Sequence, residues 1–143
     1  MFNPLVANIG IHYDLFDYNQ DQQWRHRVGL AYTISDKTTL RAAWGYYYQS
    51  PIYIELTNTK GADVINPKAE KAIHYVFGIE RQFGNNFNIR FEGYIKILTQ
   101  MIGHYFKFQE SSKYPIIKYG NPFNGHAKGI ELFINGDIIP NLL

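Results

Sequence analysis

The chain has 143 residues, a formal net charge of +2 and an aromatic content of 17%. The small net charge gives no support for a nucleic-acid partner, and the absence of cysteine excludes disulfides, thiolate zinc sites and thiol catalysis. No apolar run approaches the ~20 residues that a membrane-spanning helix needs. The N-terminus lacks the basic start and apolar core of a signal peptide, so we expect a mature form or a fragment of a longer chain.

Apolar and polar residues alternate with a period of two along most of the chain, which indicates β-strands. Six strands are predicted, at residues 5–16, 25–34, 38–49, 71–83, 87–98 and 126–135. They are longer than the roughly five or six residues usual in soluble proteins and match the ~9–11 residues of a tilted membrane strand.

The connections between these strands differ in length. A polar stretch of medium length, tight turns and long loops are expected in turn, at residues 17–23, 35–37, 50–69, 84–86, 99–124 and 136–141. Outer-membrane barrels have short periplasmic turns and long extracellular loops. The pattern therefore predicts an all-β fold: an antiparallel up-and-down meander of about six long strands that forms part of a transmembrane β-barrel.

Each predicted strand has one uniformly apolar face and one mixed face. In a membrane barrel the apolar face meets lipid and the mixed face lines a polar lumen. The predicted lumen residues are Arg27, Arg41, Glu80, Arg90, Glu92, Lys96 and Glu131. They could form a polar track for a ligand or plug, or a salt-bridge ladder between neighbouring strands. Aromatic rings near strand ends on the apolar face predict a membrane-interface girdle at Trp44, Tyr46 and Tyr48.

Ligand contacts are expected mainly in the long loops and the upper lumen, because binding residues concentrate in loops on rigid scaffolds. The candidates are Tyr47, Gln49, Tyr53, Tyr105, Phe106, Phe108, Tyr114 and Tyr119. They could form an aromatic surface for a siderophore or sugar, or pack the loops against each other. No catalytic residue, cofactor or metal site is predicted, since no two of the five histidines have the spacing of metal ligands.

Four segments, taken in order, resemble the barrel of TonB-dependent outer-membrane receptors. They are RVGLAYTISDKTTLRAAWG at residues 27–45, NPKAEKAIHYVFGIE at 66–80, FEGYIK at 91–96 and KGIEL at 128–132. The first is similar to the family's P-R-x-G-L-A-Y strand and its T-x-L-R-A-x-x-G return, with His26 where proline is usual.

The resemblance implies a 22-stranded barrel with an N-terminal plug, in the outer membrane of a Gram-negative bacterium. Such receptors import ferric siderophores, cobalamin or glycans with energy delivered by TonB. Six strands cannot close a barrel, so the chain is expected to be a single barrel segment over 1–143 without a plug domain. Its expected partners are outer-membrane lipid, the rest of the barrel and the plug of the parent receptor, TonB through that plug, and a small-molecule or glycan ligand.

Two alternatives remain open at this point. The chain could be a small soluble β-protein that binds glycans through its aromatic residues. It could also belong to another outer-membrane barrel, and an enzyme of that kind would need a Ser/His pair at one rim, for which Ser50 and His74 flank the same predicted loop.

Overall fold

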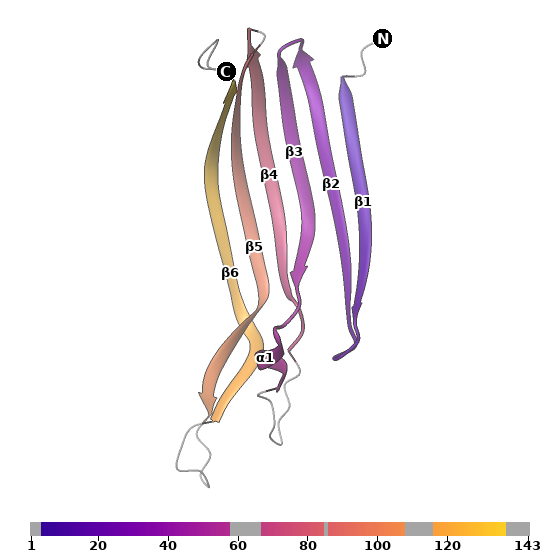
Figure 1. Cartoon of the computed structure of the whole chain (residues 1–143), viewed down its shortest axis with the longest axis vertical. Helices are drawn as coiled ribbons and strands as arrows, with labels where there is room; N and C mark the ends of the chain where they lie inside the picture. Colours follow the sequence, from indigo (N-terminus) through magenta and orange to yellow (C-terminus); the bar gives the residue numbers. More distant parts are fainter. Residues whose placement is uncertain (1–3, 58–66, 85, 108–115, 137–143) are drawn as a thin grey trace, which may run out of the picture.

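The computed structural model describes residues 4–57, 67–84, 86–107 and 116–136. Its elements are β1 (Leu5–Phe16), β2 (Asp21–Ser35), β3 (Thr38–Gln49), α1 (Tyr53–Thr57), β4 (Glu70–Phe83), β5 (Phe87–Lys107) and β6 (Ile116–Gly136). The six strands form one antiparallel sheet in the order of the chain (Figure 1). The predicted all-β meander is therefore confirmed, and the described sheet is open, with β1 and β6 at its edges.

The register of the sheet aligns residues of one face in rows that cross all six strands. One such row pairs Asn8 with Gly29, and then continues through Ala43, Val76, Tyr94 and Gly129. Because side chains alternate between the two faces of a strand, each row belongs to one face only. The predicted separation of an apolar and a mixed face therefore extends across the whole sheet.

The described sheet is a single layer without a hydrophobic core. Leu56 and Ala69 are the buried hydrophobic residues of the described chain. Long apolar side chains lie open instead, such as Ile9 and Ile130, which are 77% and 72% exposed. A soluble domain must bury such a face against a second layer, so the sheet as described does not have the architecture of a small soluble β-protein.

Three strands extend further than the alternation predicts. β2 begins at Asp21, β5 continues to Lys107 and β6 starts at Ile116, so the first connection shrinks to the turn at 17–20 and much of 99–124 is a hairpin. The expected medium stretch at 17–23 and loop at 99–124 were wrong in this respect. Residues 99–124 lack the period-two alternation from which strands were predicted, whereas the backbone pairing of β5 and β6 continues into them.

The short-turn end has tight connections, as expected. Gly84 has a φ of +61°, a conformation that glycine adopts without steric cost. The N–H of Thr33 donates to the carbonyl oxygen of Pro4 at 2.7 Å, and that of Gln82 to Lys37 at 2.8 Å. Main-chain pairing therefore continues to the tips of the strands. The expected turn at 136–141 lies, beyond Gly136, outside the described residues.

The helix α1 lies at the opposite end and was not predicted. The N–H of Ile52 donates to the carboxylate of Glu55 at 2.8 Å, which satisfies one of the free donors at the start of the helix. No helix in the described chain is long and apolar enough to cross a bilayer.

Candidate functional site

The polar face at the short-turn end carries two ion pairs. The Nε of Arg41 lies 2.6 Å from a carboxylate oxygen of Glu80, and Asn88 donates to the other oxygen at 2.7 Å. Arg90 lies 3.3 Å from Glu92 on the same strand. Arg41 and Glu80 form one salt bridge between neighbouring strands, whereas the Arg90–Glu92 pair lies within β5, so the choice between a polar track and a salt-bridge ladder stays a prediction.

A belt of positive charge crosses the middle of the same face. We call it the cationic belt: the cations Arg27 and Lys96, with the imidazole of His74 between them on the same register row of the sheet. Tyr47 stacks on His74 with ring centroids 4.2 Å apart, and the guanidinium of Arg27 lies 5.0 Å from the Tyr47 ring. Neither Arg27 nor Lys96 forms a salt bridge with a described carboxylate.

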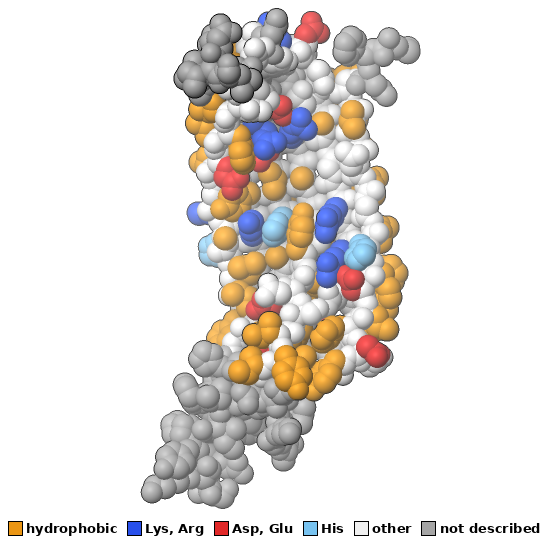
Figure 2. Space-filling model, in the orientation of Figure 1, with side chains coloured by type: hydrophobic (Ala, Val, Ile, Leu, Met, Phe, Trp, Pro, Cys, Tyr) orange, Lys and Arg blue, Asp and Glu red, His pale blue; other side chains and the backbone are white. Residues whose placement is uncertain are grey.

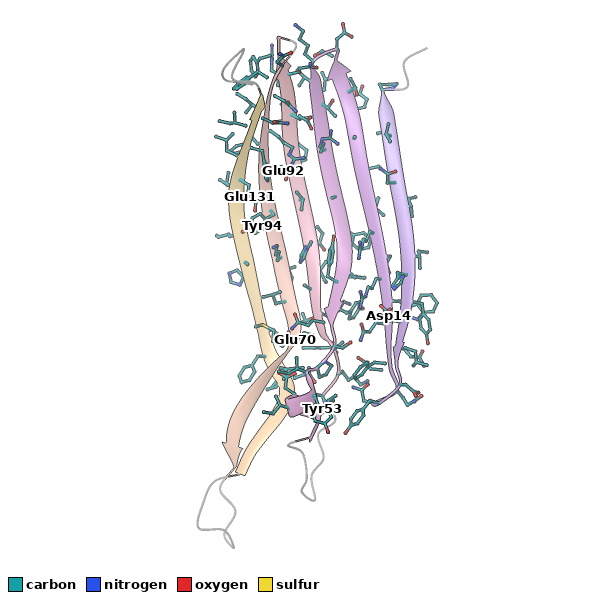
Figure 3. The ribbon with its side chains drawn as sticks, in the orientation of Figure 1. Asp14, Tyr53, Glu70, Glu92, Tyr94 and Glu131 are labelled. Atoms are coloured by element: carbon teal, nitrogen blue, oxygen red, sulfur yellow. The ribbon has the colours of Figure 1, made fainter. Side chains whose placement is uncertain are left out.

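Figure 2 looks onto this mixed face and shows basic, acidic and histidine side chains in bands across it, with hydrophobic side chains gathered towards the α1 end. Glycines let large side chains lie flat across the neighbouring strand. A Cβ on Gly129 would meet the hydroxyl of Tyr94 at 2.6 Å, and one on Gly78 would meet Cγ of Glu92 at 2.7 Å. Glu131 lies opposite Glu92 in the register of β5 and β6 (Figure 3).

The loop end of β1, β2 and β3 is joined by a polar chain. Arg25 forms a 2.9 Å ion pair with Asp14 and donates to Gln23 at 3.1 Å. The amide of Gln23, which is only 1% exposed, donates to the hydroxyl of Ser50 at 3.1 Å. Since a buried amide is costly without partners, this chain fixes the start of the β3–β4 connection against the β1–β2 hairpin.

The end of the same connection is held by the tip of the β1–β2 hairpin. We call Pro67–Glu70 the return segment, because it leads the chain back into the sheet. Asn19 donates to the carbonyl oxygen of Pro67 at 2.8 Å, and the N–H of Ala69 donates to the carboxylate of Asp21 at 2.8 Å. Pro67 and Ala69 are buried as a result.

The β5–β6 hairpin holds the return segment from the other side. Asn121 accepts from the N–H of Lys68 and donates to its carbonyl oxygen, both at 2.8 Å, and donates to the carbonyl oxygen of Gln100 at 2.7 Å. The carboxylate of Glu70 accepts from the N–H of Ile102 at 2.7 Å. The two hairpins and the return segment therefore form one braced rim (Figure 3, around Glu70).

The structure describes the predicted ligand residues to different extents. Tyr47 and Gln49 lie exposed on the polar face near this rim, and Tyr53 lies on α1, 77% exposed. For Tyr105, Phe106 and Tyr119 the structure describes only the backbone, which belongs to the extended β5–β6 hairpin. Phe108 and Tyr114 lie outside the described residues. A shared aromatic surface formed by all eight residues therefore stays a prediction.

The aromatic residues of the apolar face form a cluster at the loop end. The rings of Trp44 and Tyr46 contact each other edge to face at 5.2 Å, His26 lies 4.2 Å from Tyr46, and the ammonium of Lys71 lies 4.1 Å from the Tyr46 ring. Tyr48 lies on the same face, 5.9 Å from the Lys71 ammonium. The sequence pattern placed Trp44, Tyr46 and Tyr48 on this face but did not indicate their contacts with His26 and Lys71. A role of the three rings at a membrane interface stays a prediction.

Neither a metal centre nor a Ser/His pair is assembled from the described side chains. No group of three or more potential ligands lies close enough there to hold a metal ion. The Ser50 hydroxyl accepts from Gln23, whereas His74 stacks on Tyr47 and lies opposite Gly45 in the register, five residues from Ser50 along β3. The sequence had also missed the residues of the braced rim, since Asn19, Asp21 and Asn121 lie in polar stretches without periodicity.

Comparison with known proteins is consistent with this geometry. A family model described as the β-barrel of TonB-dependent receptor-like proteins matches residues 2–138. No curated protein sequence matches the chain significantly.

Solved structures with the same fold are larger proteins. A mutant of the ferric enterobactin receptor PfeA from Pseudomonas aeruginosa, solved with enterobactin, matches with a TM-score of 0.76 and 14% identity over 92% of this chain and 22% of its own. A second PfeA mutant gives 0.75 and 15% over 94% and 22%. The copper transporter OprC gives 0.58 and 22% over 85% and 20%. The chain thus spans about a fifth of these proteins.

Proposed function

Because this chain belongs to the family of TonB-dependent receptor-like β-barrels, we propose that it forms part of the barrel wall of an outer-membrane receptor that imports a scarce ligand. The observation that carries the proposal is a family match over residues 2–138, which includes every described strand. Barrels of this family are outer-membrane proteins of Gram-negative bacteria. The chain would act as one segment of a larger, non-enzymatic receptor.

The two faces of the sheet have different roles in this proposal. The apolar face contacts lipid, with Trp44, Tyr46 and Tyr48 at the interface, and the mixed face lines the lumen. The short turns point to the periplasm and the braced rim points outwards. The rest of the barrel and a plug complete the receptor, and TonB acts through that plug.

The ligand belongs to the siderophore, cobalamin or glycan class in this proposal. The cationic belt and its stacked Tyr47 favour an anionic ligand within that range, because its two cations, Arg27 and Lys96, have no described carboxylate partner. Tyr47 and Gln49 would contact it where the lumen opens at the braced rim. A ferric siderophore would meet the charge requirement better than a neutral glycan.

The facing of the sheet can be tested with single cysteines, since the chain has none of its own. Ala42 and Ala43 are neighbours on β3 that point to opposite faces. In membranes, Ala43→Cys should react with a water-soluble maleimide and Ala42→Cys should be protected until the membrane is dissolved. Equal reactivity of both, or the reverse order, would contradict the proposed membrane placement.

Import can be tested with the parent receptor in a strain that lacks its own uptake systems. A panel of radiolabelled ferric siderophores, cobalamin and oligosaccharides should show uptake of one class, which stops when TonB is deleted. Tyr47→Ala should reduce binding of that ligand several-fold, while the matched change Tyr48→Ala on the opposite face should not. No TonB-dependent uptake of any compound in the panel would count against the proposal.

A further inference from the structure

The apolar face contains a groove that neither the strand pairing nor ligand import requires. It has a volume of about 870 Å³ and is lined by residues of β2 to β6, most of them apolar residues of this face. Two small residues, Ala42 and Gly93, lie in the groove among larger apolar side chains of the same face and give it depth. A membrane-facing sheet needs apolar surface but no hollow, so the groove is a feature to be explained.

The register shows how the hollow at Gly93 is enclosed. Phe77 and Ile130 are its partners on the neighbouring strands, and Phe91 and Ile95 precede and follow it on the same face of β5. A Cβ at Gly93 would have nothing within 4 Å. The space is therefore open above the backbone and walled on four sides, with Ala42 beyond Phe77 extending it towards β2.

A positive charge lies at the loop side of this groove. Lys128 lies on the apolar face of β6, two residues before Ile130, and its register partner Ile95 also lines the groove. It is exposed and forms no salt bridge with a described carboxylate. His126 lies on the same face, two residues before Lys128 and nearer the loop end, and Lys71 of β4 lies nearer that end still.

An ammonium group on a lipid-facing surface is costly unless its side chain reaches the headgroup layer. The row that contains Lys128 also contains Trp44 and Tyr75, residue types that are enriched at membrane interfaces. Lys128 therefore lies where an anionic headgroup can pair with it, and the groove runs from that point into the hydrocarbon layer.

We propose that the groove binds an acyl chain of a phosphorylated lipid of the outer leaflet, and that the phosphate of this lipid pairs with Lys128. The occupant must have one anionic end and one apolar tail, in the order in which the sheet presents Lys128 and the groove around Gly93. This inference rests on the proposed membrane placement and is independent of ligand import. It adds a fixed lipid site to a surface that otherwise contacts lipid without selectivity.

The test uses the receptor purified from membranes in mild detergent, with lipid binding measured by native mass spectrometry. The probes are phosphatidic acid and diacylglycerol with identical acyl chains, so that they differ in the phosphate alone. The receptor should bind phosphatidic acid about fivefold more tightly, since one cation near a membrane surface contributes that much. Lys128→Gln should remove this preference and leave diacylglycerol binding unchanged.

Filling the groove should have a different effect. Gly93→Leu places a side chain in open space and should weaken the binding of both lipids about tenfold or more, because the acyl chain loses its contacts. Ala7→Leu, on the same face and outside the groove, and Lys37→Gln, at a short turn, are the matched controls and should change neither affinity.

Three results would overturn the site. The first is equal affinity for the two lipids, and the second is unchanged lipid binding in the Gly93→Leu variant. The third is a receptor dimer that dissociates in the Gly93→Leu variant, because a second copy would then cover the groove. A wrong membrane placement would be recognised separately, from the maleimide reactivity of the Ala42→Cys and Ala43→Cys variants. A receptor that passes the cysteine test and binds neither lipid would refute the lipid site alone.

Discussion

The two ends of the polar face are held together in different ways. At the short-turn end, side chains on paired strands contact each other, as Arg41, Glu80 and Asn88 do. At the braced rim, side chains bind the main chain of segments far away in sequence, as Asn121 does with Lys68, 53 residues before it. The first arrangement follows from strand register, whereas the second depends on where the β1–β2 and β5–β6 hairpins meet the return segment.

This difference indicates that the side-chain contacts at the two ends of the strands contribute to stability in different ways. The ion pairs of the short-turn end add modest stability to strand pairing that the backbone already provides, because partly exposed ion pairs contribute little. The braced rim instead gives irregular backbone its hydrogen-bond partners, which the strands cannot supply. Removing a contact at the rim should therefore have a larger and more local effect.

The largest effect is expected for Asn121→Ala, which removes three hydrogen bonds to Lys68 and Gln100. The return segment should open more easily by about 2 kcal/mol, since each bond contributes roughly 0.5–1.5 kcal/mol. Faster amide hydrogen exchange at residues 67–70 would measure this. Asn124→Ala, which loses one long bond of 3.4 Å, is the control and should change little. Unchanged exchange in Asn121→Ala would show that the rim is not held by this residue.

A smaller effect is expected at the other end for Glu80→Ala. It removes the acceptor of both Arg41 and Asn88 and should lower the free energy of unfolding by about 1 kcal/mol or less, because the Arg41 side chain is 45% exposed. Urea unfolding in the membrane or detergent measures it, and added salt should reduce the difference. Glu80→Gln keeps an acceptor for Asn88, so its free energy of unfolding should lie between those of the unchanged protein and Glu80→Ala. A loss larger than that of Asn121→Ala would reverse the proposed ranking of the two ends.

The smallest effects are expected for glycines of the polar face. Gly78→Ala would bring a Cβ to 2.7 Å from Glu92 and 3.0 Å from the Phe91 carbonyl oxygen, so it should destabilise by about 0.5–1 kcal/mol. Gly29→Ala meets nothing within 4 Å and should be neutral or stabilising by a few tenths of a kcal/mol, roughly. The unfolding midpoint in urea compares them. Equal midpoints would mean that Glu92 moves aside freely.

The same comparison shows what the sequence could predict. The bounds 5–16 and 38–49 were confirmed, because alternation runs through most of each segment and the turn or loop residues that follow, from Asp17 and from Ser50, mark its end. The pairing of Arg41 with Glu80 was accessible too, since both were expected on the polar face and the antiparallel register brings their strands together.

The rest could not be predicted, because it depends on contacts without a periodic signal. The start of β2 was missed at Asp21, Gln22 and Gln23, three polar residues in a row that conceal the strand. The return segment is fixed by Asn19 and Asn121, which nothing in the local sequence distinguishes from ordinary loop residues. Such contacts are known only when the strands that present them have been placed.

The irregularity in the β5–β6 hairpin has a consequence for how this sheet can be altered. The register shifts around Met101, Gln100 has a φ of +57°, and the hairpin then bends away from the sheet (Figure 1). Glu70 and Asn121 anchor the main chain at this bend. We therefore expect that the part of the β5–β6 hairpin beyond this bend can be replaced by a hairpin of another length or composition. The six-stranded sheet on the other side of the bend should keep its register.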